Sequence, residues 1–172
     1  MRIKWFSLIR ITGLLLVLLY HFFQTIFPGG FFGVDVFFTF SGFLITALLL
    51  EEFGKARQID LLGFFKRRFY RIVPPVVLMV LVTMPFTFLV RQDYVAGIGG
   101  QIAGVLGFMT NFYEMLTGGS YESQFIPHLF VHNWSLAVEV HYYILWGLAV
   151  WFLSKRSKSS SQLRGMVFLL ST

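Results

Sequence analysis

One apolar stretch, residues 29–45, constrains the fold of this chain more than any other feature. It is hydrophobic enough to cross a lipid bilayer, yet it contains the carboxylate of Asp35 together with hydroxyl groups and glycines. An ionisable group in such a segment is costly, so it usually faces protein or a water-filled cavity. On a helix, four residues of this region share one stripe: Asp35, Thr39, Gly42 and Thr46. We therefore expect a membrane-spanning helix with one polar edge that packs closely against protein.

The composition of the whole chain fits the same environment. Of its 172 residues, 56% are hydrophobic and 13% are charged, whereas about a quarter are charged in a soluble domain. The sequence has no cysteine, which excludes a disulfide framework, thiol catalysis and a cysteine-ligated metal. Its net charge of +6 is clustered in short segments, which favours contact with an anionic membrane face over binding of nucleic acid. We expect an integral membrane protein.

Five apolar segments predict an all-α, polytopic transmembrane helix bundle. They lie at about residues 9–27, 33–50, 72–90, 95–115 and 134–153, and the start of a sixth lies at 166. The intervening segments are predicted to be loops, namely a charged loop at 51–71, a polar loop at 117–133 and a basic loop at 155–164. Pro74 and Pro75 are expected in the first turn of the third helix, where a missing N–H costs little.

The distribution of basic residues predicts the orientation, because such residues concentrate in cytoplasmic loops. This rule places the N-terminus and the loops at 51–71 and 155–164 in the cytoplasm of a multi-pass protein of the cell membrane. Five crossings cannot satisfy these assignments, because the loop at 155–164 would then lie outside. Either the glycine-rich segment 95–115 is re-entrant or interfacial, or the charge bias fails here; we favour the first.

Two ionisable residues of the first predicted helix, Arg10 and His21, share one face. They are about three turns apart, or roughly 16 Å along the helix axis. Histidine is the side chain best suited to proton transfer near neutral pH. The face therefore indicates a catalytic cavity that reaches into the membrane. The alternative is that Arg10 extends to the interface and His21 forms a hydrogen bond to a neighbouring helix.

A basic sequence, Lys66-Arg67-Arg68-Phe69-Tyr70-Arg71, directly precedes the third predicted helix. Arg71 follows Arg67 by four residues and Arg68 by three, so either pair can present two guanidinium groups on one helix face. Arginine matches phosphate with two hydrogen bonds. The segment is therefore a candidate site for a phosphorylated donor such as a coenzyme. The alternative is a topology anchor on anionic lipid.

A second intramembrane carboxylate, Glu139, lies near the start of the fifth predicted helix. It shares a helix face with Ser135, Tyr142 and Trp146. Glu139 is a candidate acid, base or orienter of a histidine, and the alternative is a hydrogen-bonded clamp between helices. The nearby histidines lack a metal-binding spacing, so no metal site is expected at His128, His132 and His141.

Four groups of residues together resemble the membrane-bound acyltransferase 3 family, which includes peptidoglycan, O-antigen and macrolide O-acyltransferases. In chain order they are Tyr20-His21, Gly33-Val34-Asp35-Val36-Phe37-Phe38 with Ser41-Gly42-Phe43-Leu44-Ile45-Thr46, Arg67-Arg68-Phe69-Tyr70-Arg71-Ile72-Val73-Pro74, and Trp134-Ser135-Leu136-Ala137-Val138-Glu139. The order and separations are similar to those of the family. Within it, the chain looks most like the membrane domain of Gram-positive peptidoglycan O-acetyltransferases.

The resemblance implies transfer of an acetyl group from a cytosolic acyl-coenzyme A donor to a hydroxyl of a cell-wall or surface glycan. It implies that His21 acts as the base or as an acyl relay. The candidate catalytic residues are His21, Glu139 and Asp35, and the candidate donor-binding residues are Arg10, Arg68 and Arg71. No bound cofactor is expected, since acetyl-coenzyme A would be a co-substrate. The expected partners are membrane lipid and the glycan acceptor, without nucleic acid.

The chain also departs from the family pattern. Trp5-Phe6-Ser7-Leu8 stands where Gly-Leu-Asp-Gly is usual, and Val140 and His141 stand where acidic and glutamine residues are usual. The family domain has about ten spans, so residues 1–172 are expected to be a partial, truncated domain without turnover of its own, and a separate polypeptide is one expected source of the missing spans. The alternative is a non-catalytic remnant or partner subunit of a larger acyltransferase.

Overall fold

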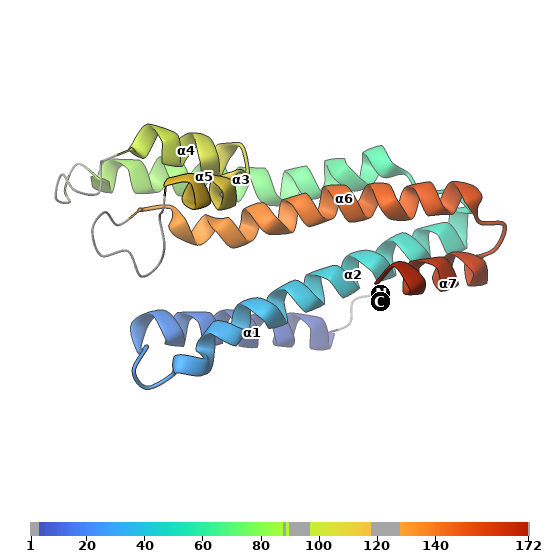
Figure 1. The fold of residues 1–172 in the computed structure, drawn as a ribbon, viewed down its shortest axis with the longest axis horizontal. Coiled ribbons are helices and arrows are strands. Elements are labelled where there is room, and N and C mark those ends of the chain that lie inside the picture. The colour runs from blue at the N-terminus through green and yellow to red at the C-terminus, as the bar shows by residue number, and fades with distance from the viewer. Residues whose placement is uncertain (1–3, 88, 90–96, 118–127, 172) are drawn as a thin grey trace. The chain divides into compact units, whose positions relative to one another are not determined.

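The computed structural model describes residues 4–87, 89, 97–117 and 128–171. Within these ranges the chain is helical and contains no β-strand, which confirms the all-α prediction (Figure 1). The elements are, in order, α1 (Lys4–Phe22), η1 (Pro28–Phe31), α2 (Phe32–Ala56), α3 (Leu61–Thr87), α4 (Ile98–Leu106), α5 (Thr110–Thr117), η3 (Val131–Asn133), α6 (Trp134–Arg156) and α7 (Ser160–Ser171). They form two compact units: a first unit of Met1–Ile59 with Ala149–Thr172, and a second unit of Asp60–Leu148.

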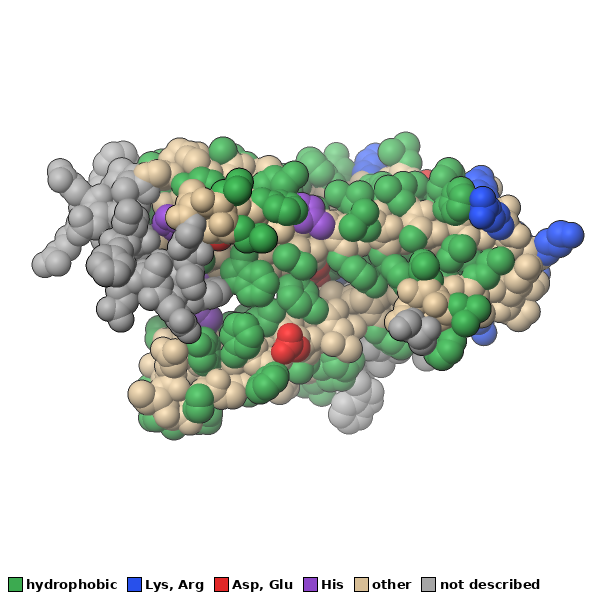
Figure 2. All heavy atoms as spheres, in the orientation of Figure 1, with side chains coloured by type: hydrophobic (Ala, Val, Ile, Leu, Met, Phe, Trp, Pro, Cys, Tyr) green, Lys and Arg blue, Asp and Glu red, His purple; other side chains and the backbone are tan. Residues whose placement is uncertain are grey.

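Three helical segments in the described part of the chain are long and apolar enough to cross a membrane: Pro28–Ala56, Leu61–Thr87 and Val131–Arg156. The 27 residues of α3 extend about 40 Å, more than the ~30 Å hydrocarbon core of a bilayer. Large apolar side chains are spread over the face that Figure 2 shows. Among the exposed ones, Leu78 and Leu145 are 62% and 69% exposed. Such surfaces suit lipid rather than water. The predicted number of five spans is not confirmed.

The predicted charged loop at 51–71 is wrong, because both ends of it are helical. α2 and α3 leave only residues 57–60 between them. Arg57 ends α2 in the left-handed conformation, with φ of 56°, and the carboxylate of Asp60 accepts a hydrogen bond from the Gly63 N–H at 2.9 Å, as a helix cap does. Glu, Lys and Arg are good helix formers, so the helices continue where hydropathy falls.

The predicted basic loop at 155–164 is also shorter than expected, because the helices continue where hydropathy falls. α6 continues to Arg156 and α7 begins at Ser160. Ser159 caps α7, since its hydroxyl accepts a hydrogen bond from the Gln162 N–H at 3.1 Å. The helix that carries the sixth apolar segment therefore begins six residues before that segment.

Pro74 and Pro75 do not lie in a first turn, as predicted, but inside α3. The helix begins at Leu61 because the Asp60 cap fixes its start, well before the hydropathy rises. Helices that cross membranes tolerate internal proline, because neighbouring groups can satisfy the backbone that it leaves unpaired.

The glycine-rich segment at 95–115 is not one helix. It divides into α4 and α5, and Phe108 between them has a φ of 53°. The nine residues of α4 extend about 14 Å, too short to cross a bilayer alone. A single crossing helix is therefore excluded here, while a re-entrant path stays a prediction. Most of the predicted polar loop at 117–133 lies outside the described residues.

In the first unit, α1 packs against η1 and α2 where glycines allow the backbones to approach. A Cβ added at Gly33 would lie 2.9 Å from Cγ2 of Val17. One added at Gly13 would lie 3.2 Å from the Gly33 carbonyl oxygen, and one added at Gly30 would lie 2.8 Å from Cβ of Tyr20. Real Cβ atoms rarely pack so closely, so glycine is required at this contact.

The polar edge predicted for α2 is not its packed face. Asp35 and Thr39 are exposed, and the buried residues of this helix are Gly33, Ser41, Ile45, Leu49 and Phe53. The Thr39 hydroxyl donates a hydrogen bond to the Asp35 carbonyl oxygen of its own helix at 2.8 Å. It is thereby satisfied without a neighbouring helix, which is why spacing alone gave the wrong face.

In the second unit, a small apolar core joins α3 and α4 to the segment before α6. Its buried members are Val76, Val80, Val105 and Phe130. The side chain of Gln101, only 1% exposed, accepts a hydrogen bond from the Phe130 N–H at 3.4 Å. This bond ties α4 to the start of the Val131–Arg156 segment.

Candidate functional site

His21 lies in the last turn of α1, where its side chain is exposed. Its Nδ1 donates a hydrogen bond to the Val17 carbonyl oxygen at 2.8 Å. The Tyr20 ring meets the imidazole edge-on, with ring centroids 5.5 Å apart. The bond places the proton of a neutral imidazole on Nδ1 and leaves the lone pair on Nε2, where a base would need it.

The other two candidates of the first unit are Asp35 and Arg10. Asp35 lies in the first turn of α2, where the helix dipole favours a negative charge. The side chain of Arg10 lies outside the described part of the chain, so its alignment with His21 stays a prediction. Gly13, three residues after Arg10 on α1, packs against Gly33 at the start of α2. α1 therefore approaches α2 two residues before Asp35.

In the second unit, Arg68 is held by two aromatic rings. Its guanidinium carbon lies 5.6 Å from the centre of the Phe64 ring and 5.4 Å from the centre of the Tyr143 ring. Both distances are within the range of a cation–π interaction. Arg71, one turn later on α3, is exposed. α3 thus presents one arginine braced by α6 and one that faces outward.

Tyr143 connects Arg68 to Glu139. Its hydroxyl donates a hydrogen bond to Oε1 of Glu139, and the two residues are 5% and 7% exposed. The basic segment of α3 and the carboxylate of α6, which the sequence predicted as separate candidates, are therefore joined through one side chain. Sequence reasoning missed Tyr143, although it stands four residues after Glu139 and hence on the same helix face.

The residues predicted to accompany Glu139 have other contacts. Ser135 donates a hydrogen bond to the His132 carbonyl oxygen at 3.3 Å. The rings of Tyr142 and Trp146 stack, with centroids 5.8 Å apart. The partner of the carboxylate is the tyrosine one position further along.

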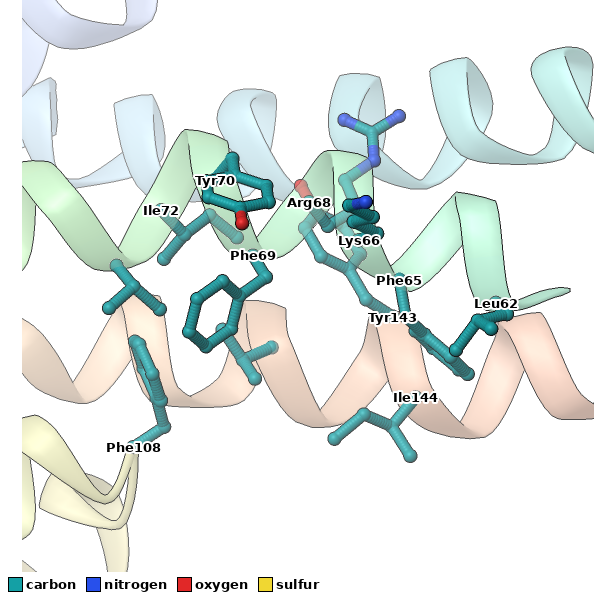
Figure 3. Close-up of a pocket in the computed structure, with 12 residues that line it drawn as sticks. Leu62, Phe65, Lys66, Arg68, Phe69, Tyr70, Ile72, Phe108, Tyr143 and Ile144 are labelled. Carbon is teal, nitrogen blue, oxygen red and sulfur yellow. The ribbon is translucent and has the colours of Figure 1, made fainter.

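A groove of about 630 Å³ lies beside Arg68. Figure 3 shows the side chains of α3, α6 and the α4–α5 connection that line it. Most of them are apolar, and Lys66 and Arg68 are the charged members: Leu62, Phe65, Lys66, Arg68, Phe69, Tyr70, Ile72, Val73, Phe108, Val140, Tyr143 and Ile144. A groove of this kind suits a ligand with an apolar chain and an anionic group.

The structure divides the predicted catalytic residues between the two units. His21 and Asp35 belong to the first, and Arg68, Arg71 and Glu139 to the second. Their meeting in one cavity stays a prediction. Among the described residues, no group of three His, Asp or Glu side chains could hold a metal ion.

These features define a helical membrane protein with a braced arginine, a buried carboxylate and an oriented histidine. The chain belongs to the acyltransferase family whose model, described as an acyltransferase domain, matches residues 3–172. The resemblance predicted from the motifs is confirmed.

Its relatives include bacterial O-acetyltransferases. The chain is 33% identical over 150 residues to O-acetyltransferase OatA of Staphylococcus aureus strain NCTC 8325 / PS 47. The aligned region covers 87% of this chain and 25% of the relative. It is 34% identical over 136 residues to putative O-acetyltransferase SACOL0978 of strain COL, which covers 79% of this chain and 22% of that protein. The chain thus spans about a quarter of the length of these relatives. No solved structure matches it.

Proposed function

We propose that this chain is part of a membrane O-acyltransferase. It moves an acetyl group from acetyl-coenzyme A, on the cytoplasmic side, to a hydroxyl of a cell-wall or surface glycan. Membership of the acyltransferase family over residues 3–172 carries the proposal. The relatives named as O-acetyltransferases support an acetyl group as cargo and oxygen as its acceptor.

His21 is the proposed base. As the acceptor hydroxyl oxygen attacks the thioester carbonyl carbon, Nε2 takes the hydroxyl proton. The C–S bond then breaks and coenzyme A leaves as a thiolate, which receives that proton from the imidazolium. The bond from Nδ1 to the Val17 carbonyl supports this role because it holds the ring in the required tautomer. The carboxylates of Asp35 and Glu139 are the proposed partners that favour the cationic ring.

Arg68 and Arg71 are the proposed donor-binding residues, together with Arg10. The phosphates of coenzyme A would accept hydrogen bonds from the two guanidinium groups of α3. Bracing of Arg68 against Phe64 and Tyr143 lowers the entropy lost when phosphate binds. The apolar groove beside Arg68 suits the less polar arm of the coenzyme.

Binding of coenzyme A tests the proposal without requiring turnover. The chain is reconstituted in lipid nanodiscs, and coenzyme A is titrated into the wild type and into the double variant Arg68→Ala with Arg71→Ala. Each charge-assisted hydrogen bond contributes ~1.5–3 kcal/mol, so affinity is expected to fall at least about 100-fold.

A matched control removes the same charge from the first unit, through Lys158→Ala with Arg164→Ala. Both side chains are exposed, and the affinity for coenzyme A should stay unchanged. Equal affinity in the wild type and the Arg68 and Arg71 variant would leave these arginines as lipid anchors and remove the donor site from the proposal.

A further inference from the structure

The groove beside Arg68 opens onto an apolar, exposed side of the second unit. Both helices that flank it, α3 and α6, belong to segments long and apolar enough to cross a membrane. Three of its lining side chains on these helices, Leu62, Phe69 and Ile144, are 80%, 57% and 43% exposed. A membrane lipid can therefore enter the groove sideways from the bilayer, without an aqueous path.

The groove is about as long as one acyl chain. Its lining runs along α3 from Leu62 to Val73, which is about 16 Å of helix. One leaflet contributes half of the ~30 Å hydrocarbon core of a bilayer, or about 15 Å. Figure 3 shows Phe108 and Leu62 at opposite ends of the groove. Phe108 packs against the apolar core that contains Val105, so it closes its end with a fixed side chain.

The lining of the groove is hydrocarbon apart from four side chains. Those with hydrogen-bonding groups are Lys66, Arg68, Tyr70 and Tyr143, and the Tyr143 hydroxyl already donates to Glu139. An acyl chain has no polar group that such a lining would leave without a partner. The long apolar part of the groove therefore suits a hydrocarbon chain.

Two cationic side chains select the headgroup of that lipid. Lys66 and Arg68 are the charged members of the described lining, which contains no acidic residue. Lys66 is exposed, and the Arg68 guanidinium is held by the rings of Phe64 and Tyr143. Both groups form charge-assisted hydrogen bonds to phosphate. A headgroup with a net negative charge is therefore favoured over a zwitterionic one.

A basic segment beside a membrane attracts anionic lipid even without a site. That attraction depends on total charge and is insensitive to the acyl chain. A groove next to two cations predicts instead a single bound lipid whose affinity depends on both its chain and its headgroup.

We propose that this groove binds one anionic phospholipid, with an acyl chain along the groove and the headgroup phosphate at Lys66 and Arg68. The inference goes beyond the proposed function and does not rest on it. The lipid occupies the groove while coenzyme A is absent.

The test is native mass spectrometry of the chain, purified in a mild detergent. The chain is titrated with dioleoylphosphatidylglycerol, which is anionic, or with dioleoylphosphatidylcholine, which is zwitterionic and has the same acyl chains. One molecule of the anionic lipid should bind first, at least about 5-fold more tightly than the zwitterionic lipid, as expected for the contribution of one lysine or arginine near an anionic headgroup.

A first pair of variants tests the charge. Lys66→Gln should lower the affinity for the anionic lipid about 5-fold and leave that for the zwitterionic lipid unchanged. Lys158→Gln is the matched control, because Lys158 is also exposed but belongs to the first unit. Its affinity for both lipids should equal that of the wild type.

A second pair of variants tests the acyl chain. Ile144→Trp fills the groove and should remove the first bound molecule of either lipid. Leu145→Trp is the control, since Leu145 is the next residue on α6, is 69% exposed and does not line the groove. Both positions are exposed, so both variants should fold, and only Ile144→Trp should lose the lipid.

Three results would each overturn the inference: equal affinity for the two lipids, equal effects of Lys66→Gln and Lys158→Gln, or equal effects of Ile144→Trp and Leu145→Trp. A dimer that excludes lipid would also overturn it, by assigning the groove to a second copy of the chain. No coenzyme A is present in these titrations, so their failure leaves the proposed donor site intact. Failure of coenzyme A to bind would likewise leave the lipid site intact.

Discussion

The hydrogen bond from Tyr143 to Glu139 allows a sharp test of how the second unit is held together. In Tyr143→Phe the ring keeps its place 5.4 Å from the Arg68 guanidinium, but the hydroxyl that donates to Glu139 is lost. Glu139 is 7% exposed, so water cannot easily replace that donor. The variant therefore separates the hydrogen bond from the cation–π contact.

The expected cost follows from the charge and burial of the acceptor. A hydrogen bond to a charged group contributes ~1.5–3 kcal/mol, and a buried acceptor left without a partner costs a similar amount. We expect Tyr143→Phe to lower the unfolding free energy by about 2–3 kcal/mol. In the background of Glu139→Gln, which removes the charge, the same substitution should cost at least ~1 kcal/mol less, because contacting residues are coupled.

The assay is unfolding of the detergent-solubilised chain by increasing sodium dodecyl sulfate, followed by circular dichroism. Tyr70→Phe is the matched control, since Tyr70 belongs to the same unit and is 66% exposed; its effect should stay within about 0.5 kcal/mol. A cost of Tyr143→Phe no larger than that of the control would refute the reasoning. So would an equal cost with and without the Glu139 charge.

Three further predictions concern the first unit and the topology. His21→Ala in a complete acyltransferase domain should lower acetyl transfer by ~10²–10⁴-fold with membrane insertion retained, whereas His141→Ala should not; full activity of the His21 variant would assign the base elsewhere. Gly33→Ala should destabilise the chain by about 1–3 kcal/mol through overpacking, while Gly54→Ala, where an added Cβ meets nothing within 4 Å, should be neutral or stabilising in the same detergent assay. A cysteine placed at Gln58 should react with an impermeant thiol reagent only from the cytoplasmic side, because basic residues cluster around it. Labelling from outside would contradict the predicted orientation.

Hydropathy predicted which parts of the chain enter the membrane better than where its helices end. The segment predicted at 134–153 corresponds closely to α6, because its apolar run ends near the helix end. α3 instead begins at Leu61, since the Asp60 cap and the helix-forming basic residues extend it beyond the apolar run. The thickness of the bilayer determines the length of the apolar run, but it does not determine where the helix begins and ends.

The candidate site was predictable where its contacts are local or carried by recognised motifs. The Glu139–Tyr143 bond follows helix spacing and was accessible from sequence, although Tyr142 was chosen. The contact of Arg68 with Tyr143 depends on how α3 and α6 pack, and the hydrogen bond from His128 to Glu114 joins residues fourteen positions apart in sequence. Neither arises from a periodicity, so single-sequence reasoning had no means to find them.

The prolines inside α3 make the helix easier to bend next to the turn that carries the arginines. Proline has no N–H, so Pro74 and Pro75 cannot donate to the carbonyl groups four residues earlier, those of Tyr70 and Arg71. Two successive backbone hydrogen bonds of the helix are therefore missing next to Arg71. Bending α3 at this level breaks fewer hydrogen bonds than bending it elsewhere. A bend at this level would therefore cost less than a bend elsewhere in α3, and it would reorient the turn that carries Arg68 and Arg71 relative to the C-terminal part of the helix.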